Sequence, residues 1–162
     1  MTANVSTEDH GFDRALLGEI VDRSSDAVVV VDAHGVICYW NAGAERIFRL
    51  SCGEAIGQSL NLIIPERLQD RHWTAFRTAV STGASRYGAE DLLAVPAVAA
   101  DGRTISIEFT VVLLGVADRV GHVAAIIRDV TARRAQEREL RKRVQQLEEA
   151  QVEPPARPDS PR

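Results

Sequence analysis

The sequence predicts an α+β fold in which short helices cover one face of an antiparallel sheet. Apolar and β-branched runs flank two turn signals, Asp32-Ala33-His34-Gly35 and Asp101-Gly102, a pattern typical of β-hairpins. Between these turns, residues 41–81 show helical rather than alternating periodicity. An antiparallel sheet with one apolar face needs a cover, and this helical block is the segment available to supply it.

Size and composition fit one globular domain with an additional helix or tail. The chain has 162 residues, of which 45% are hydrophobic and 26% are charged. A formal net charge of -4 offers no basic surface for a phosphate backbone, so direct nucleic-acid binding is not expected. The polar N-terminus and the lack of a long apolar run predict a cytoplasmic protein with no membrane attachment. Cys38 and Cys52 lack the spacing of a disulfide framework or a zinc site.

The first quarter of the chain is predicted to form a helix and a β-hairpin. Residues 1–10 are polar and are predicted to be disordered. Residues 11–23 carry apolar side chains at four-residue spacing, which predicts a short amphipathic helix. Two strands are predicted at 28–31 and 36–40, on either side of the first turn signal.

Capping signals delimit the helices of the covering block. Asn41 is a candidate N-cap, and Ser51 with Glu54 has the spacing of a capping box for a second short helix. The longest helix of this block is predicted to start at Pro65, which a first helical turn tolerates, and to end at Thr82-Gly83.

Three further strands are predicted after this block. Residues 86–100 suit an edge or bulged strand because they contain Pro96. After the second turn signal the chain alternates, and four apolar residues fall on one face: Ile105, Ile107, Phe109 and Val111. A loop is expected at 115–121, followed by a last strand at 122–130.

The C-terminal segment is charged and helical. An exit helix is predicted at 131–150, with Leu140, Val144 and Leu147 as its apolar stripe, followed by a disordered tail at 151–162. Isolated helices of this length are marginal in water. We therefore expect the N-terminal and exit helices to be buried in a homodimer.

The pieces DAVVVVDAHGVICYWNAGAERIF, Gly57, Asp101-Gly102 and RDVT (residues 128–131), in this order, resemble a PAS sensor domain. The likeness covers roughly residues 20–135 and assigns 24–130 to the domain itself. It implies a five-stranded antiparallel sheet of order 2-1-5-4-3 that encloses a ligand pocket together with the helices. It also implies that Asp129 and Thr131 relay a signal from the last strand to the exit helix.

His72 is the main candidate for chemistry. On a helical wheel it shares the inward face with Leu68 and Phe76, while Arg71 points away. A buried imidazole without a partner costs about 1–3 kcal/mol, so something should bond to it. The functional candidate is a metal, in particular haem iron, and the alternative is a backbone carbonyl or a water.

The segment PERLQDRHWTAFRTAVSTG resembles the proximal helix of the haem-binding PAS gas sensors, such as the nitrogen-fixation sensor kinases. Pro65-Glu66, His72 and Thr82-Gly83 keep the family's register, and the resemblance implies that His72 is the axial ligand of haem b. Three positions depart from the pattern. Ala75 stands where an aromatic is expected, with Phe76 one place later. Leu92 or Leu93 stands where a distal arginine or methionine is expected, and Trp73 replaces a small or acidic residue.

The remaining haem contacts are predicted to come from the helix and the sheet: Leu68, Phe76, Arg86, Leu92, Leu93, Ile107, Phe109, Val111 and Ile126. Arg86 can pair with a propionate or be an ordinary exposed arginine. A distal side made by Leu92 or Leu93 has no donor for bound O2, so CO or NO is expected to bind better, or another axial ligand to occupy the iron.

Other function classes find less support in the sequence. A flavin photosensor of this fold needs a cysteine between residues 60 and 70, and none is present, so no flavin is expected. No nucleophile–base pair or phosphate loop is apparent, which predicts a non-enzyme. We expect a stand-alone, homodimeric sensor that passes its signal to a separate protein, for example in regulation of transcription. A PAS interaction module with another small ligand or a filled core is the alternative, and the chain can also be a fragment of a longer protein.

Overall fold

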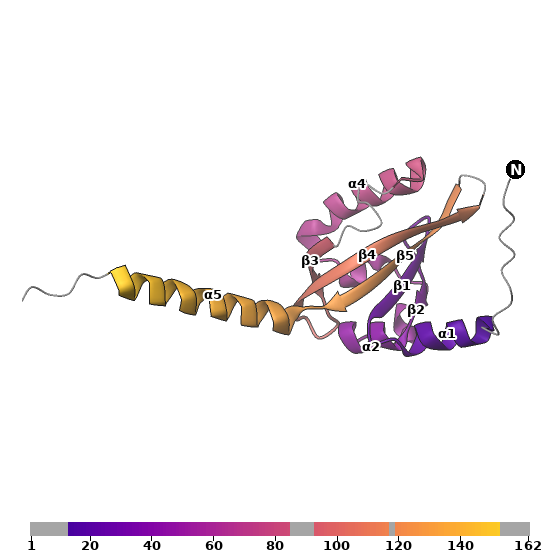
Figure 1. The fold of residues 1–162 in the computed structure, drawn as a ribbon. Helices are drawn as coiled ribbons and strands as arrows, with labels where there is room; N and C mark the ends of the chain where they lie inside the picture. Colours follow the sequence, from indigo (N-terminus) through magenta and orange to yellow (C-terminus); the bar gives the residue numbers. More distant parts are fainter. Residues whose placement is uncertain (1–12, 85–92, 117–118, 153–162) are drawn as a thin grey trace, which may run out of the picture. The chain divides into compact units, whose positions relative to one another are not determined.

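A computed structural model describes residues 13–84, 93–116 and 119–152. Five strands form one antiparallel sheet of order β2-β1-β5-β4-β3 (Figure 1). The strands are β1 (Ala27–Asp32), β2 (Ile37–Trp40), β3 (Leu93–Val98), β4 (Thr104–Val116) and β5 (Arg119–Asp129). The helices are α1 (Arg14–Arg23), α2 (Ala42–Phe48), α3 (Cys52–Ala55), the 3-10 helix η1 (Leu60–Ile63), α4 (Glu66–Thr82) and α5 (Thr131–Val152). The predicted fold class and strand order are confirmed.

The first hairpin forms where the turn signal predicts it. Asp32 holds the turn because its Oδ1 accepts hydrogen bonds from the backbone N–H groups of His34 (2.8 Å) and Val36 (2.9 Å). Gly35 adopts φ +80°, a conformation that favours glycine. β1 then pairs with β5 along its whole length, so the hairpin lies at one edge of the sheet, with β1 next to the central strand β5.

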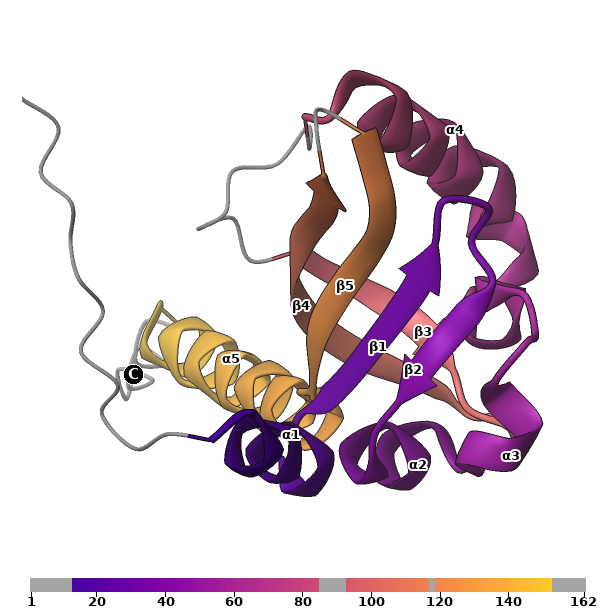
Figure 2. The same cartoon turned by 90° about the vertical axis from the view of Figure 1, so that its right-hand side faces the viewer.

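The covering helices begin and end at their predicted signals. Asn41 caps α2 through its side-chain oxygen, and Ser51 with Glu54 forms the expected capping box of α3. Pro65 stands at the N-cap of α4, and Gly83 ends that helix with φ 65°. α2, α3 and α4 follow one another along one side of the sheet (Figure 2).

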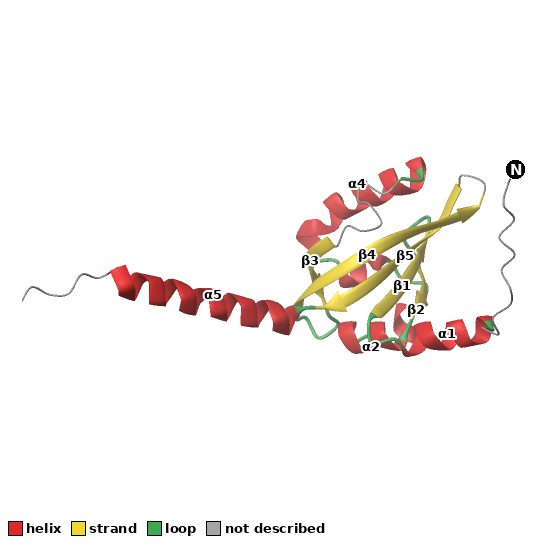
Figure 3. Ribbon diagram, in the orientation of Figure 1, coloured by secondary structure: helices red, strands yellow, loops and turns green. Residues whose placement is uncertain are grey.

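The last two strands are longer than predicted. The loop expected at 115–121 is wrong, because β4 continues to Val116 and β5 starts at Arg119 (Figure 3). Gly115 is accommodated by a register shift between Leu114 and Gly115 rather than by a loop. β3 is an edge strand and contains Pro96, as expected for a residue that cannot donate a backbone hydrogen bond.

The two faces of the sheet differ in character. Along β4, Ile105 and Ile107 are buried in the core and Phe109 packs against it, so the predicted alternation is confirmed. The residues of this face join the covering helices in one hydrophobic cluster, in which Phe48 and Phe76 are the buried aromatic rings of α2 and α4.

Two compact units are distinguished, one ending at Asp129 and the other beginning at Val130. In the first, α1 starts at Arg14 rather than at the predicted residue 11, which lies outside the described residues. In the second, α5 runs two residues beyond the predicted 131–150. The predicted apolar stripes of both helices are exposed: Leu16, Leu17, Ile20 and Val21 in α1, and Leu140, Val144 and Leu147 in α5. Among the described helices, none has the length and apolar character needed to cross a membrane.

Candidate functional site

His72 lies in the middle of α4 and is half-buried. Its Nε2 is the buried side-chain atom without a hydrogen-bond partner among the described residues. Burial lowers the pKa of the imidazole below its ordinary value of 6.5. Burial therefore favours the neutral ring at physiological pH. In the tautomer that carries its proton on Nδ1, the lone pair of Nε2 is available to a ligand or a metal ion.

Two aromatic rings of the same helix flank the imidazole. Phe76 stacks on it at a centroid distance of 6.1 Å and an interplanar angle of 25°. Trp73 meets it edge-on, at 5.0 Å and 83°. These contacts hold the ring by its faces and edge but supply no polar partner for Nε2.

The predicted lining residues are only partly brought together. Phe76 and Ile107 belong to the same buried cluster, and Phe109 packs against it. Leu68, Leu93 and Val111 are half-buried. These positions agree with the sheet face and the helix face that were predicted.

Ile126 was wrongly assigned to this set. Its side chain is 47% exposed, and it pairs with Thr110 on the opposite face of the sheet. Ile127, which pairs with Phe109, is the residue that is buried. Because side chains alternate along a strand, the error of one residue moves the side chain to the other face. Arg86 and Leu92 lie outside the described residues.

The two predicted relay residues stand at the junction of the last strand and the exit helix. Asp129 is the final residue of β5, and Thr131 is the first residue of α5. Asp129 pairs with Ile107 of β4, whose side chain is buried in the core. The end of β5 is therefore next to a residue of the predicted site.

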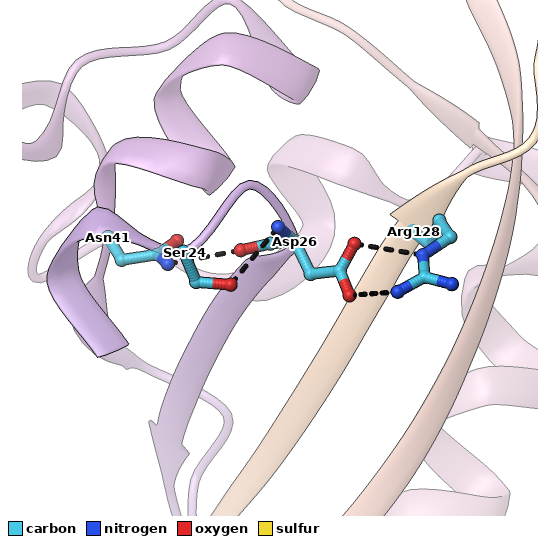
Figure 4. Close-up of polar contacts among 4 residues, drawn as sticks. All are labelled: Ser24, Asp26, Asn41 and Arg128. Atoms are coloured by element: carbon cyan, nitrogen blue, oxygen red, sulfur yellow. Dashed lines mark hydrogen bonds and ion pairs between the residues drawn. The ribbon is translucent and has the colours of Figure 1, made fainter. Parts of the chain in front are cut away.

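A second polar cluster joins α1, the start of β1 and α2, and the sequence did not predict it. Asn41 is buried, and its amide group uses all of its capacity. The Oδ1 atom accepts from the backbone N–H groups of Val28 and Ala44, both at 2.9 Å. The Nδ2 group donates to the carbonyls of Val21 (2.7 Å) and Asp26 (3.1 Å; Figure 4). The predicted cap of α2 is thus also the junction of three elements.

Asp26 connects this junction to the far end of β5 (Figure 4). Its carboxylate accepts two hydrogen bonds from the Arg128 guanidinium, from Nε at 2.9 Å and from Nη2 at 2.6 Å. These bonds lower the pKa of Asp26 below its ordinary value, although burial acts in the opposite direction. Asp26 lies just before β1, and Arg128 is the penultimate residue of β5. The Asp26–Arg128 ion pair therefore links the start of the first strand to the end of the last.

Tyr39 provides a further bond between α1 and the sheet. Its hydroxyl donates to the Asp22 carboxylate. Burial, together with this acceptor, raises the pKa of Tyr39 to about 12. The C-terminal end of α1 is therefore fixed by hydrogen bonds, while its apolar stripe is exposed.

Comparisons with known proteins agree with the geometry. A family model described as "PAS fold" matches residues 21–135, well over half of the chain. The sensor protein FixL of Bradyrhizobium diazoefficiens is 43% identical over 56 residues, which are 35% of this chain and 11% of that protein. An uncharacterised protein of Azorhizobium caulinodans is 36% identical over 127 residues, 74% of this chain and 17% of that protein.

A solved structure shows the same fold over a greater share of its own length. The PAS domain of a protein from Colwellia psychrerythraea superposes with a TM-score of 0.64 at 25% identity, covering 73% of this chain and 97% of that domain. By contrast, the chain spans between a tenth and a fifth of the two curated relatives, 11% and 17%. The likeness to those two proteins is therefore a likeness of one domain.

Proposed function

The chain belongs to the PAS fold family of sensory domains in signalling, and from that premise we propose that it binds haem b through His72 and senses a diatomic gas or redox state. One observation carries the proposal. The buried Nε2 of His72 has no hydrogen-bond partner among the described residues. Such an atom costs free energy in the ligand-free fold, and a bound iron would remove that cost.

The surroundings of His72 suit a haem ligand. A neutral imidazole is the form that binds iron, and burial favours that form. When bound, haem supplies an iron that takes up CO, NO or O2. Phe76, Ile107 and Phe109 provide apolar surface that excludes water from the site. Ile127 takes the place first given to Ile126.

The other predicted contacts keep their roles as part of the proposal. Leu68, Leu93 and Val111 are half-buried and apolar, as a haem edge requires. Leu93 has no side-chain donor to hold bound O2, so the proposal favours CO or NO. A second leucine, Leu92, and a propionate partner, Arg86, belong to the same proposal.

We also propose how the state of the site is transmitted. Asp129 and Thr131 would relay the state of the site into α5. The exposed apolar stripes of α1 and α5 would be buried against the second subunit of a homodimer. The chain would act without enzymatic activity, through a separate signalling protein, for example in regulation of transcription.

The alternative is a PAS interaction module that holds another small ligand or has a filled core. The packing of Trp73 and Phe76 against His72 favours it, because these rings already occupy the space beside the imidazole. In that case Nε2 would accept a hydrogen bond from a small polar ligand or from water.

An absorbance spectrum tests the proposal. Protein produced with haem available should show a Soret band that is absent in His72→Ala and shifts when CO is added. His122→Ala is the matched control, because His122 is exposed on β5 and pairs with residues of the outer face. Far-UV circular dichroism shows whether each variant is folded. A wild-type protein without a Soret band refutes haem binding and leaves the interaction module. An O2 complex as stable as the CO complex would contradict the expected gas preference.

A further inference from the structure

Trp73 is anchored to two segments outside its own helix. Its indole Nε1 donates a hydrogen bond to Oδ1 of Asn61 at 2.7 Å. Asn61 belongs to η1, the short helix that precedes α4. The bond therefore fixes the Trp73 side chain to a neighbouring element rather than to solvent.

The ring of Trp73 also lies directly against the turn of the first hairpin. A Cβ atom at Gly35 would stand 2.3 Å from two carbons of the indole, closer than any real contact. Gly35 has φ +80°, and Asp32 accepts the turn's N–H groups. A glycine is thus needed at this position both for the backbone and for the approach of the indole.

Anchoring Trp73 determines where His72 points. Successive residues of an α-helix are turned by about 100°, so the position of one side chain fixes the direction of the next. The indole meets His72 edge-on at 5.0 Å and Phe76 edge-on at 5.4 Å. A rotation of α4 that carried Nε2 of His72 toward water would pull the indole off Asn61 and Gly35.

This restraint acts against a real tendency of the helix. A buried nitrogen without a partner is better solvated than buried, so the imidazole by itself favours turning α4 outward. We propose that Trp73 is a positioning residue that holds the His72 imidazole turned into the core, through its contacts with Asn61 and Gly35. The purpose of this restraint rests on the proposed function of His72, since an inward imidazole is useful only to a ligand.

The accessibility of His72 tests the proposal in haem-free protein. Diethyl pyrocarbonate modifies exposed neutral imidazoles, and peptide mass spectrometry gives the rate at each histidine, with the exposed His122 as the internal reference. The rate at His72 should be low in the wild type. It should rise roughly fivefold in Trp73→Phe and in Asn61→Leu, the factor expected from the loss of one hydrogen bond. Asn61→Asp keeps an acceptor oxygen for the indole, so the rate at His72 should stay as low as in the wild type in this variant.

A matched control separates positioning from general loss of stability. Trp40 donates from its indole Nε1 to the carbonyl of Leu50 at 3.0 Å, so Trp40→Phe loses the same type of bond elsewhere in the core. Trp40→Phe should lower the melting temperature and leave the His72 rate unchanged. Unchanged rates in both Trp73→Phe and Asn61→Leu would overturn the proposal. An equal rise in Trp40→Phe would also overturn it.

The outcomes distinguish this proposal from haem binding. The modification rates are measured without haem, so they stand or fall independently of a Soret band. If the wild type binds haem, Trp73→Phe should also weaken haem affinity by a similar factor, with His72 still present. A Soret band together with unchanged modification rates would refute the positioning role alone.

Discussion

Replacing His72 by leucine should stabilise the ligand-free protein, although it removes the proposed ligand. The wild-type Nε2 is buried without a partner, which costs about 1–3 kcal/mol. Leucine fills a similar space without a polar atom and is a better helix former. Loss of the ring contacts with Trp73 and Phe76 costs about 0.5–1.5 kcal/mol. The net expectation is a gain of about 1 kcal/mol in the free energy of unfolding, or about 3–6 °C in melting temperature.

The pH dependence of this gain gives a second measurement. The folded-state pKa of His72 lies below its ordinary value of 6.5 because of burial. Between that folded-state pKa and 6.5, the unfolded chain binds a proton that the folded chain does not. The free energy of unfolding of the wild type is therefore highest above this window. It decreases as the pH falls through the window, by less than about 1.4 kcal/mol per pH unit. The leucine variant lacks this group, so its advantage should grow from pH 7.5 to pH 5.5.

Urea unfolding of haem-free protein, followed by far-UV circular dichroism at both pH values, measures the two effects. His122→Leu is the control, because an exposed imidazole should change stability little in either condition. A loss of stability in His72→Leu at pH 7.5 would show that Nε2 has a partner and would refute the reasoning. A difference between variant and wild type that does not change with pH would show that the imidazole is solvated.

Two further predictions concern the contacts of Asp26 with α2 and with β5. Gly43→Ala should destabilise by about 3 kcal/mol or more in thermal melts, because its Cβ would lie 2.2 Å from the Asp26 carbonyl oxygen. Gly53→Ala, with nothing within 4 Å of its Cβ, should instead be neutral or stabilise by about 0.5–1 kcal/mol. Arg128→Gln should lower the urea midpoint at low salt and less so at high salt, with a smaller effect from Arg103→Gln in an exposed pair. Equal salt dependence in the Arg128→Gln and Arg103→Gln variants would contradict the expected difference between the two ion pairs. Arg128→Gln should also raise the pH of acid unfolding, since Asp26 stabilises the fold only while ionised, above its lowered pKa.

Features fixed by neighbouring residues could be predicted from the sequence. The hairpin turn at 32–35, the Asn41 cap, and the Ser51–Glu54 capping box depend on side chains that bond to backbone a few residues away. The helical period likewise placed His72 on the inward face of α4. Such local signals act within one element, so the order of elements and the inward histidine followed from them.

Features that depend on pairing between distant strands could not be predicted in the same way. Ile126 and Ile127 are adjacent and chemically identical, and only the register with Phe109 decides which of them is buried. Gly115 suggested a loop, but the hydrogen bonds of the β4–β5 hairpin continue past it through a register shift. The Asp26–Arg128 pair joins residues 102 positions apart, and no pattern in the sequence indicates that distance.

The orientation of α4 shows how local and distant determinants combine. Its apolar stripe directs Phe76 into the core, but the same stripe contains a histidine whose nitrogen finds no partner there. The stripe alone therefore leaves a conflict between burial of the helix face and solvation of the imidazole. Trp73 flanks that face and packs against the core. Its bond to Asn61 and its contact with Gly35 oppose the outward turn. The proposed ligand of His72 would account for a costly polar atom that a separate anchor keeps in the core, whereas packing alone would be better served by leucine.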